Sequence, residues 1–242
     1  MSQTPASLER THPPGVPRIV SLLPSTTETL LAWGVPPVAC TRFCEQPHLR
    51  HVGGTKDPDI DAIEALSPDL VVMDREENRR EDAEEIARRG IALHITHVVS
   101  LGDVEPTMRA LWEAAGRPDV DPWPAATGGS EVPSRGAFIP IWRRPWMTIS
   151  DHTYGSSLLA ACGVRNVFGT SVDRYPETTL DEAATRRPDL VLLPSEPYAF
   201  TERHVAEVSV VSPDVRLIDG QDLFWWGVRT VAALQRLRAA LA

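Results

Sequence analysis

The feature that most constrains the fold is an internal repeat, because the same short strings recur in the same order in both halves of the chain. Gly34 and Gly163 each close an apolar run, and they lie 129 residues apart. The string Pro-Asp-Leu-Val recurs at 68–71 and 188–191, which is a spacing of 120 residues. The difference indicates nine extra residues in the first half, near 45–53. We therefore interpret the chain as two copies of one folding unit.

Each copy has the pattern of short strands alternating with helices. Residues 18–23 form an apolar run typical of a buried strand, and Ser25 with Glu28 has the spacing of a capping box that opens a helix. The repeat aligns Ser21 with Ser150, so each should end the first strand of its copy. Strands that alternate with helices favour parallel sheets covered by helices. The expected fold is α/β, with two similar Rossmann-like lobes.

A helix and a linker are predicted between the two copies. Residues 103–116 have an amphipathic pattern, with Met108, Leu111 and Trp112 facing inward. Residues 117–135 are rich in Pro, Gly, Ala and Ser, as linkers are. The predicted boundaries are 18–100 for the N-terminal lobe, 101–135 for the interlobe helix and linker, and 136–242 for the C-terminal lobe.

Charge and hydropathy exclude several classes of partner. The formal net charge is −9, and the sequence has no run of Lys or Arg, so nucleic-acid binding is not expected. No segment has the apolar length of a transmembrane helix, and we expect no direct membrane insertion. The polar, proline-rich start has no apolar core of a signal peptide. The chain as it stands is therefore expected in the cytoplasm, or in the periplasm or at the cell surface if an upstream signal is missing.

The expected strand ends define the candidate site, because ligands of open α/β sheets bind beyond the carboxyl ends of the strands. Aromatic and polar side chains gather at these positions, which suits a large, flat, partly apolar ligand with polar edges. Core packing is the alternative for any single tryptophan. The candidate ligand-binding residues are Phe43, Asp74, Trp142, Arg143, Trp146, Asp151, Tyr154, Tyr198, Trp225 and Trp226.

One segment of this site permits a local prediction. Pro145 disfavours a helix, so residues 142–146 are expected to be extended at the edge of the lobe. Side chains alternate along an extended segment, so Trp142, Arg144 and Trp146 should share one side. Arg143 should point to the other side.

Signals for catalysis and for a protein-held metal are weak. The sequence has no phosphate-binding glycine loop and no nucleophile elbow, so we expect no catalytic residues. The histidine pairs 48/51 and 94/97 have too few companions for a metal site, and none is expected. Cys40, Cys44 and Cys162 are an odd number of cysteines without a disulfide framework, and we expect buried thiols.

Several of these strings together resemble a known superfamily. Residues 18–28 (RIVSLLPSTTE), 52–61 (VGGTKDPDID) and 67–71 (SPDLV) are similar, in this order, to the helical-backbone metal receptors, the class III substrate-binding proteins of ABC importers. Residues 141–148 (IWRRPWMT) and 195–198 (SEPY) resemble its cobalamin-binding branch. The resemblance covers roughly 18–100 and 138–240. The superfamily joins its lobes by one long helix, which is shorter here.

The resemblance implies a non-enzymatic binding protein that captures a metal chelate in the cleft between two lobes. Cobalamin is the favoured ligand, and haem or a ferric siderophore is next. The metal would arrive inside the ligand, so no intrinsic cofactor is implied. An ABC importer permease is the implied partner, with Glu196 and Glu202 as docking residues. Two alternatives stay open: a cytoplasmic corrinoid- or tetrapyrrole-processing enzyme with the same fold, and an interaction module without a small ligand.

Overall fold

The computed structural model describes residues 16–117 and 134–242, which form two compact units. Within the described residues, unit 1 consists of 16–96 and 111–117, and unit 2 of 97–110 and 134–242. The linker predicted at 117–135 lies almost entirely outside the described residues. The predicted interlobe helix is α4 (Val104–Ala114), and its residues are divided between the two units.

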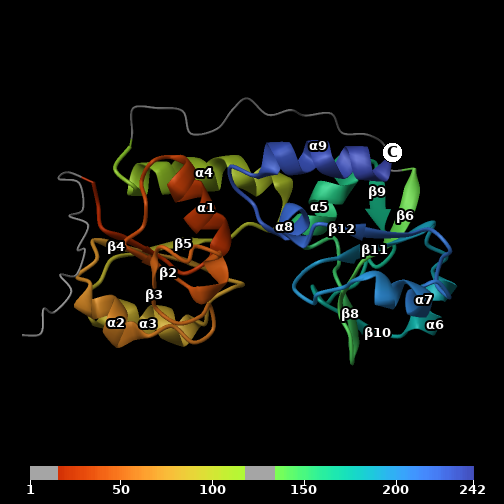
Figure 1. The fold of residues 1–242 in the computed structure, drawn as a ribbon, viewed down its shortest axis with the longest axis horizontal. Helices are drawn as coiled ribbons and strands as arrows, with labels where there is room; N and C mark the ends of the chain where they lie inside the picture. The colour runs from red at the N-terminus through yellow and green to blue at the C-terminus, as the bar shows by residue number, and fades with distance from the viewer. Residues whose placement is uncertain (1–15, 118–133) are drawn as a thin grey trace, which may run out of the picture. The chain divides into compact units, whose positions relative to one another are not determined.

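Unit 1 is built on one parallel sheet with helices on both faces. Its strands are β1 (Ile19–Ser21), β2 (Ala39–Cys40), β3 (Arg50–His51), β4 (Leu70–Asp74) and β5 (Leu93–Thr96). Its helices are α1 (Pro24–Ala32), η1 (Arg42–Cys44), α2 (Ile60–Ala65) and α3 (Arg80–Arg88). The strand order is β3-β2-β1-β4-β5, and every pair is parallel. Figure 1 shows α1 on one face of the sheet and α2 and α3 on the other.

Unit 2 contains two sheets. The strands of its parallel sheet are β6 (Arg135–Phe138), β9 (Val164–Asn166), β11 (Leu190–Pro194) and β12 (Val215–Ile218), in the order β12-β11-β6-β9. A separate antiparallel sheet contains β7 (Pro140–Trp142), β8 (Trp146–Thr148) and β10 (Glu177–Thr178). The helical segments are η2 (Leu101–Asp103), α5 (Tyr154–Ala161), α6 (Leu180–Thr185), η3 (Glu202–His204), α7 (Val205–Val208), α8 (Gly220–Phe224) and α9 (Thr230–Leu241). Figure 1 shows α5 and α9 on one face of the parallel sheet and α6 and α7 on the other.

The two parallel sheets confirm the repeat. The order β2-β1-β4-β5 in unit 1 equals the order β9-β6-β11-β12 in unit 2. Asp69 accepts a hydrogen bond from the backbone N–H of Arg18 at 2.7 Å, and Asp189 accepts one from that of Gly136 at 2.5 Å. The repeated Pro-Asp strings therefore fix the start of β1 and of β6 in the same way. Gly34 and Gly163 end α1 and α5 with φ values of 72° and 78°, a conformation that favours glycine.

The register predicted for the first strand of the second copy is wrong. The strand of unit 2 that corresponds to β1 is β6. In the matching strand orders, β1 lies between β2 and β4, and β6 lies between β9 and β11. Ser150 follows β8, which belongs to the antiparallel sheet, so Ser21 and Ser150 are not equivalent. The apolar run before Ser150 is typical of a buried strand, but it pairs with β7 and β10 instead.

The prediction of an extended segment at 142–146 is also wrong. Residues 143–145 form a turn, with a cis peptide bond before Pro145 and a φ of 70° at Arg144. Trp142 ends β7 and Trp146 begins β8, so the segment is a hairpin rather than one strand. A proline can occupy such a turn because it has no N–H to offer to a strand pair.

The capping-box prediction at the start of α1 is wrong as well. Helix α1 begins at Pro24, with Leu23 at the N-cap position and no side chain bonded to the cap. The hydroxyls of this segment turn inward, since Thr26 and Thr27 are fully buried and bond to Ser21 at 2.7 and 2.8 Å. Proline at the first helical position needs no N–H partner, so the helix can start without a cap.

Candidate ligand-binding surface

An aromatic cluster lies on unit 2, and we call Trp142, Trp146, Tyr198 and Phe200 the ring cluster. The rings of Trp142 and Tyr198 meet edge to face, with centroids 5.6 Å apart. Trp146 is stacked on Phe200 with an interplanar angle of 2° and centroids 6.0 Å apart. Tyr198 and Phe200 are themselves in contact, with centroids 4.7 Å apart. The hairpin β7–β8 and the segment after β11 therefore build one continuous aromatic surface.

Two buried side chains, Phe200 and His204, connect the ring cluster to the core of unit 2. Phe200 is buried in the core of unit 2, so it attaches the cluster to the fold. His204 is also buried, and its ring packs edge to face against Tyr198 and Phe200 at 5.6 and 5.4 Å. The Nδ1 atom of His204 accepts the backbone N–H of Thr201 at 3.0 Å, which fixes the orientation of the imidazole ring.

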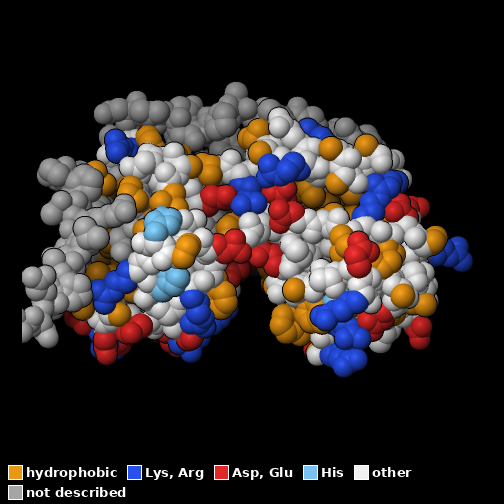
Figure 2. Space-filling view, viewed as in Figure 1, with side chains coloured by type: hydrophobic (Ala, Val, Ile, Leu, Met, Phe, Trp, Pro, Cys, Tyr) orange, Lys and Arg blue, Asp and Glu red, His pale blue; other side chains and the backbone are white. Residues whose placement is uncertain are grey.

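The exposed side of the cluster combines ring faces with positive charge. Trp142 is 43% exposed, which is unusual for a tryptophan in a folded core. Arg143 donates to both carboxylate oxygens of Glu207 at 2.8 and 3.1 Å. This hydrogen-bonded ion pair raises the pKa of Arg143, and the hydroxyl of Tyr198 is a further partner. Figure 2 shows hydrophobic side chains next to arginine side chains at the end of the unit that carries β8 and β10.

Phe43 presents a second exposed ring, on unit 1. It is 50% exposed and lies in η1, directly after β2. The guanidinium of Arg42 lies over the Phe43 ring, 4.7 Å from its centroid, and donates to both oxygens of Asp57 at 2.9 and 3.1 Å. Cys44 on the other side is buried. A ring whose position is already restricted by a neighbouring guanidinium loses less freedom when a ligand binds.

Three predicted ligand residues are buried within the fold. The carboxylate of Asp74 accepts the hydroxyl of Thr96 at 2.7 Å and the backbone N–H of Glu76 at 2.8 Å. Tyr154 is 5% exposed, and burial raises the pKa of its phenol, which lies 3.0 Å from the hydroxyl of Thr230. Trp226 is also 5% exposed. Asp74 is the last residue of β4, Tyr154 is the first residue of α5, and Trp226 comes two residues after α8, so only Asp74 lies at a strand end. All three side chains are buried.

The remaining predicted residues lie at the surface of unit 2. Trp225 is half-buried, with the guanidinium of Arg229 5.1 Å from its ring centroid. Asp151 is exposed, and its backbone N–H donates to the carbonyl of Gly169. Glu196 follows β11, and Glu202 is the first residue of η3. In the sequence they lie on either side of Tyr198 and Phe200. Their proposed roles in ligand and permease contact stay predictions.

Phe200, His204 and Glu207 were missed by the sequence analysis. Phe200 lies two residues after Tyr198, which is the spacing of side chains on one face of an extended segment. This spacing was an available signal for Phe200. His204 and Glu207 lie in η3 and α7 and had no signal, because their roles depend on how these short helices pack on the hairpin.

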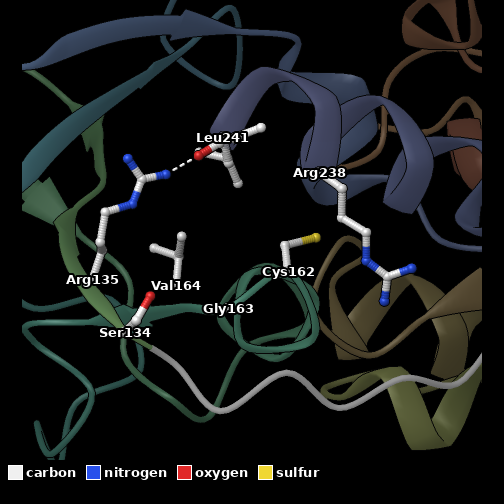
Figure 3. Close-up of a pocket in the computed structure, with 8 residues that line it drawn as sticks. Ser134, Arg135, Cys162, Gly163, Val164, Arg238 and Leu241 are labelled. Carbon is white, nitrogen blue, oxygen red and sulfur yellow. Dashed lines mark hydrogen bonds between the residues drawn. The ribbon is translucent and has the colours of Figure 1, made fainter.

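A small cavity in unit 2 lies away from the ring cluster. Its volume is about 210 Å³, less than that of most ligand pockets, and it is lined by Ser134, Arg135, Cys162, Gly163, Val164, Arg238, Leu241 and Ala242. It opens at the starts of β6 and β9, the opposite ends from those at which ligands of parallel sheets bind. Figure 3 shows Arg135 extended toward the carbonyl of Leu241 and the guanidinium of Arg238 directed away from it.

Metal ligands and membrane spans were also sought in residues 16–117 and 134–242. No group of three or more His, Cys, Asp or Glu side chains there is arranged to hold a metal ion. Burial lowers the pKa of His94, which favours its neutral form. No helix in these two ranges has the length and apolar character needed to cross a membrane.

Comparison with known proteins relates the chain to binding proteins. No family model matches it. It is 25% identical over 193 residues to the vitamin B12-binding proteins of Yersinia pestis (strain Pestoides F) and Yersinia pseudotuberculosis serotype O:1b, which covers 73% of this chain and 69% of each relative. These relatives are named for binding and not for catalysis.

Solved structures show the same fold. The periplasmic vitamin B12-binding protein BtuF of Vibrio cholerae superposes with a TM-score of 0.76 at 19% identity, over 93% of this chain and 96% of that one. The periplasmic haem-binding protein RhuT from Roseiflexus sp. RS-1 gives a TM-score of 0.76 at 20% identity, over 93% and 98%.

The comparisons overturn the expectation of a cytoplasmic chain. The vitamin B12-binding and haem-binding proteins whose solved structures share this fold are periplasmic, whereas the cytoplasmic location was expected only from residues near the start of the chain. The resemblance read from the sequence is confirmed. The chain therefore shares the two-unit α/β fold of the periplasmic proteins that bind vitamin B12 and haem, as its likeness to the helical-backbone metal receptors predicts.

Proposed function

We propose that this protein is a substrate-binding protein of the ABC-importer type that captures a metal chelate outside the cytoplasm. The favoured chelate is a corrinoid such as vitamin B12, and haem or a ferric siderophore is next. The observation that carries the proposal is the ring cluster of unit 2, in which Trp142 is 43% exposed, on a fold whose relatives bind vitamin B12 and haem.

The ring cluster supports a planar macrocycle or an aromatic chelate as ligand. Trp142 offers an exposed ring face, and Tyr198 buttresses it edge to face. Rings held in this way bury large apolar area at a small cost in side-chain entropy. Phe43 offers a second exposed ring on unit 1. That the two surfaces share one ligand stays a prediction.

Arginines beside the rings support a ligand with a polar or anionic edge. Arg143 is paired with Glu207, so it would contact a ligand while keeping the turn in place. Arg144 is exposed in the same turn and has no ion-pair partner among the described residues. A carboxylate, phosphate or amide edge of the chelate would therefore meet a cation that is free to bind it.

The proposed protein needs no catalytic residue and no cofactor of its own, because the metal arrives within the ligand. Its partner would be the permease of an ABC importer, with Glu196 and Glu202 as the docking carboxylates on unit 2. Cell fractionation tests the location: the native protein should be recovered outside the cytoplasmic membrane.

The ligand is tested by mixing the purified protein with aquocobalamin, haemin or a ferric siderophore, each of which is coloured. The expected result is a visible chromophore that stays with the protein through gel filtration. The variant Trp142→Ala should retain less of the chromophore, and its matched control is Trp33→Ala. Trp33 is half-buried at the C-terminal end of α1, and its ring packs edge to face against that of Trp112. That variant should retain the chromophore, whereas the loss of all colour from the wild-type protein would contradict the proposal.

A further inference from the structure

The side chain of Arg229 connects the start of α9 with α8. Arg229 directly precedes α9, and its side chain is 15% exposed. One nitrogen of its guanidinium donates to the buried carboxylate of Asp222 at 3.1 Å, and another donates to the side-chain oxygen of Gln221 at 3.1 Å. Because the guanidinium is a rigid planar fork, these two hydrogen bonds fix the orientation of its plane.

The fixed guanidinium lies over the indole ring of Trp225. Its central carbon is 5.1 Å from the centroid of the ring, which is within the range of a cation–π contact. Trp225 follows the last residue of α8, and its backbone N–H donates to the carbonyl of Gln221 at 2.9 Å. Both the backbone and the ring of Trp225 are therefore restrained, while the half-buried ring stays partly open to solvent.

Trp225 lies at the edge of the parallel sheet at which ligands of such sheets bind. Only Asp219 separates the end of β12 from the start of α8. Strand β12 is parallel to β11, and Tyr198 of the ring cluster comes after β11. Trp225 and the ring cluster therefore follow the carboxyl ends of neighbouring strands, where ligands of open α/β sheets bind.

We propose that Arg229 is a positioning residue for ligand binding. Its guanidinium, held by Asp222 and Gln221, keeps the Trp225 ring in the orientation in which the ring stacks on the chelate. A ring that is held before the ligand arrives loses little conformational entropy on binding. The stacking rests on the proposed function, whereas the restraint of Trp225 by Arg229 depends only on contacts within unit 2.

The restraint is tested without a ligand, by fluorine NMR of protein labelled with 5-fluorotryptophan. The resonance of Trp225 is the one that disappears in Trp225→Phe. Arg229→Lys keeps the charge but lacks the planar fork, so this resonance should shift or broaden. The matched control is Arg236→Lys, because Arg236 donates to the same Asp222 carboxylate at 2.5 and 2.6 Å, whereas the guanidinium over Trp225 is that of Arg229. The control should leave the Trp225 resonance in place.

The effect on binding is tested by absorbance titration with aquocobalamin and with haemin. Arg229→Lys should raise the dissociation constant about threefold to tenfold, the scale of a lost cation–π contact. Arg236→Lys should leave it within about twofold of the wild-type value. In a Trp225→Ala background, Arg229→Lys should again change it by less than about twofold, because the ring that Arg229 positions is absent.

The outcomes separate this proposal from the proposed function. Thermal unfolding of each variant verifies that the proteins compared are folded. The positioning role is overturned if Arg229→Lys leaves the Trp225 resonance unchanged, or if it weakens binding equally with and without the Trp225 ring. A wild-type protein that binds neither aquocobalamin nor haemin would overturn the stacking on these chelates, whereas a displaced Trp225 resonance in Arg229→Lys would still support the restraint.

Discussion

Trp142 is the single residue that most directly tests the ligand surface. Because its ring is 43% exposed, Trp142→Ala should lower the free energy of unfolding by less than the roughly 3–5 kcal/mol of a buried tryptophan. It should weaken chelate binding by roughly 1–3 kcal/mol, the scale of an aromatic anchor. Thermal unfolding and a chelate titration of the same preparation measure the two effects. A large loss of stability with unchanged affinity would exclude Trp142 from the binding surface.

Gly220 is the residue whose lack of a side chain brings the ends of β11 and β12 together. A Cβ at this position would lie 2.5 Å from the backbone nitrogen of Glu196. Gly220→Ala should therefore destabilise the fold by about 1–3 kcal/mol, because backbone next to Glu196 has to move. Denaturant unfolding measures this change.

The control for that substitution is Gly102→Ala. A Cβ at Gly102 would meet only the Ser100 hydroxyl, at 3.6 Å, which is ordinary contact. Its effect should stay within about 0.5 kcal/mol. Equal effects of the two substitutions would show that the Gly220 contact is not tight in solution.

At the scale of elements, one buried carboxylate joins α8 to α9. Asp222 is 2% exposed and accepts hydrogen bonds from Arg236 at 2.5 and 2.6 Å and from Arg229 at 3.1 Å. Figure 2 shows arginine side chains next to acidic side chains over this region. The hydrogen bond from Arg236 is the main cause that lowers the pKa of Asp222, and Arg229 adds to it.

The pH dependence of Asp222→Asn follows from this lowered pKa. A carboxylate whose pKa is lower in the folded state stabilises the protein above its ordinary pKa, and the stabilisation is lost as pH falls through the folded value. The variant should lose roughly 1–3 kcal/mol near neutral pH, and the loss should shrink in strong acid. Urea unfolding near neutral pH and in strong acid measures the loss in the free energy of unfolding. The control is Asp173→Asn, because Asp173 is exposed. A loss that is independent of pH would contradict the ion-pair explanation.

Elements were predictable where sequence pattern and local chemistry agree. The strands around 70–73 and 190–193, the helix at 103–116 and the glycine ends of α1 and α5 were all found from apolar runs and stop signals. The hairpin β7–β8 was not, because its apolar residues are the same as those of a buried parallel strand. Which sheet such a run joins is decided by pairing with distant β10, and no local pattern reports this.

For the candidate residues, the sequence indicated their positions along the chain but not the directions of their side chains. The rule that ligands bind beyond strand ends selected Trp142, Trp146 and Tyr198, which the structure places in one aromatic cluster with Phe200. It also selected Asp74 and Tyr154, which turn into the fold to satisfy Thr96 and Thr230. The position of a residue in the chain says which end of a strand it follows, whereas burial depends on packing.

For the whole molecule, binding of the correct chelate should appear as added stability. A ligand that binds only the folded state adds about 2.7 kcal/mol at a free concentration a hundred times its dissociation constant. Thermal unfolding with aquocobalamin, haemin and a ferric siderophore in turn should therefore give the largest shift for the native ligand. No shift with any of the three, for a chain that unfolds cooperatively, would refute chelate capture.

The equal strand order of the two parallel sheets has a consequence for how the hairpin β7–β8 relates to the repeat. In unit 1 the chain passes from β1 to α1 through Leu22 and Leu23, whereas in unit 2 the hairpin β7–β8 is inserted between β6 and α5. Strand β8 of this hairpin also pairs with β10, whereas β3, which corresponds to β10 in unit 1, pairs within the parallel sheet. The hairpin is therefore an addition to one copy of the repeated unit, and its residues can change without altering the strand order of either parallel sheet.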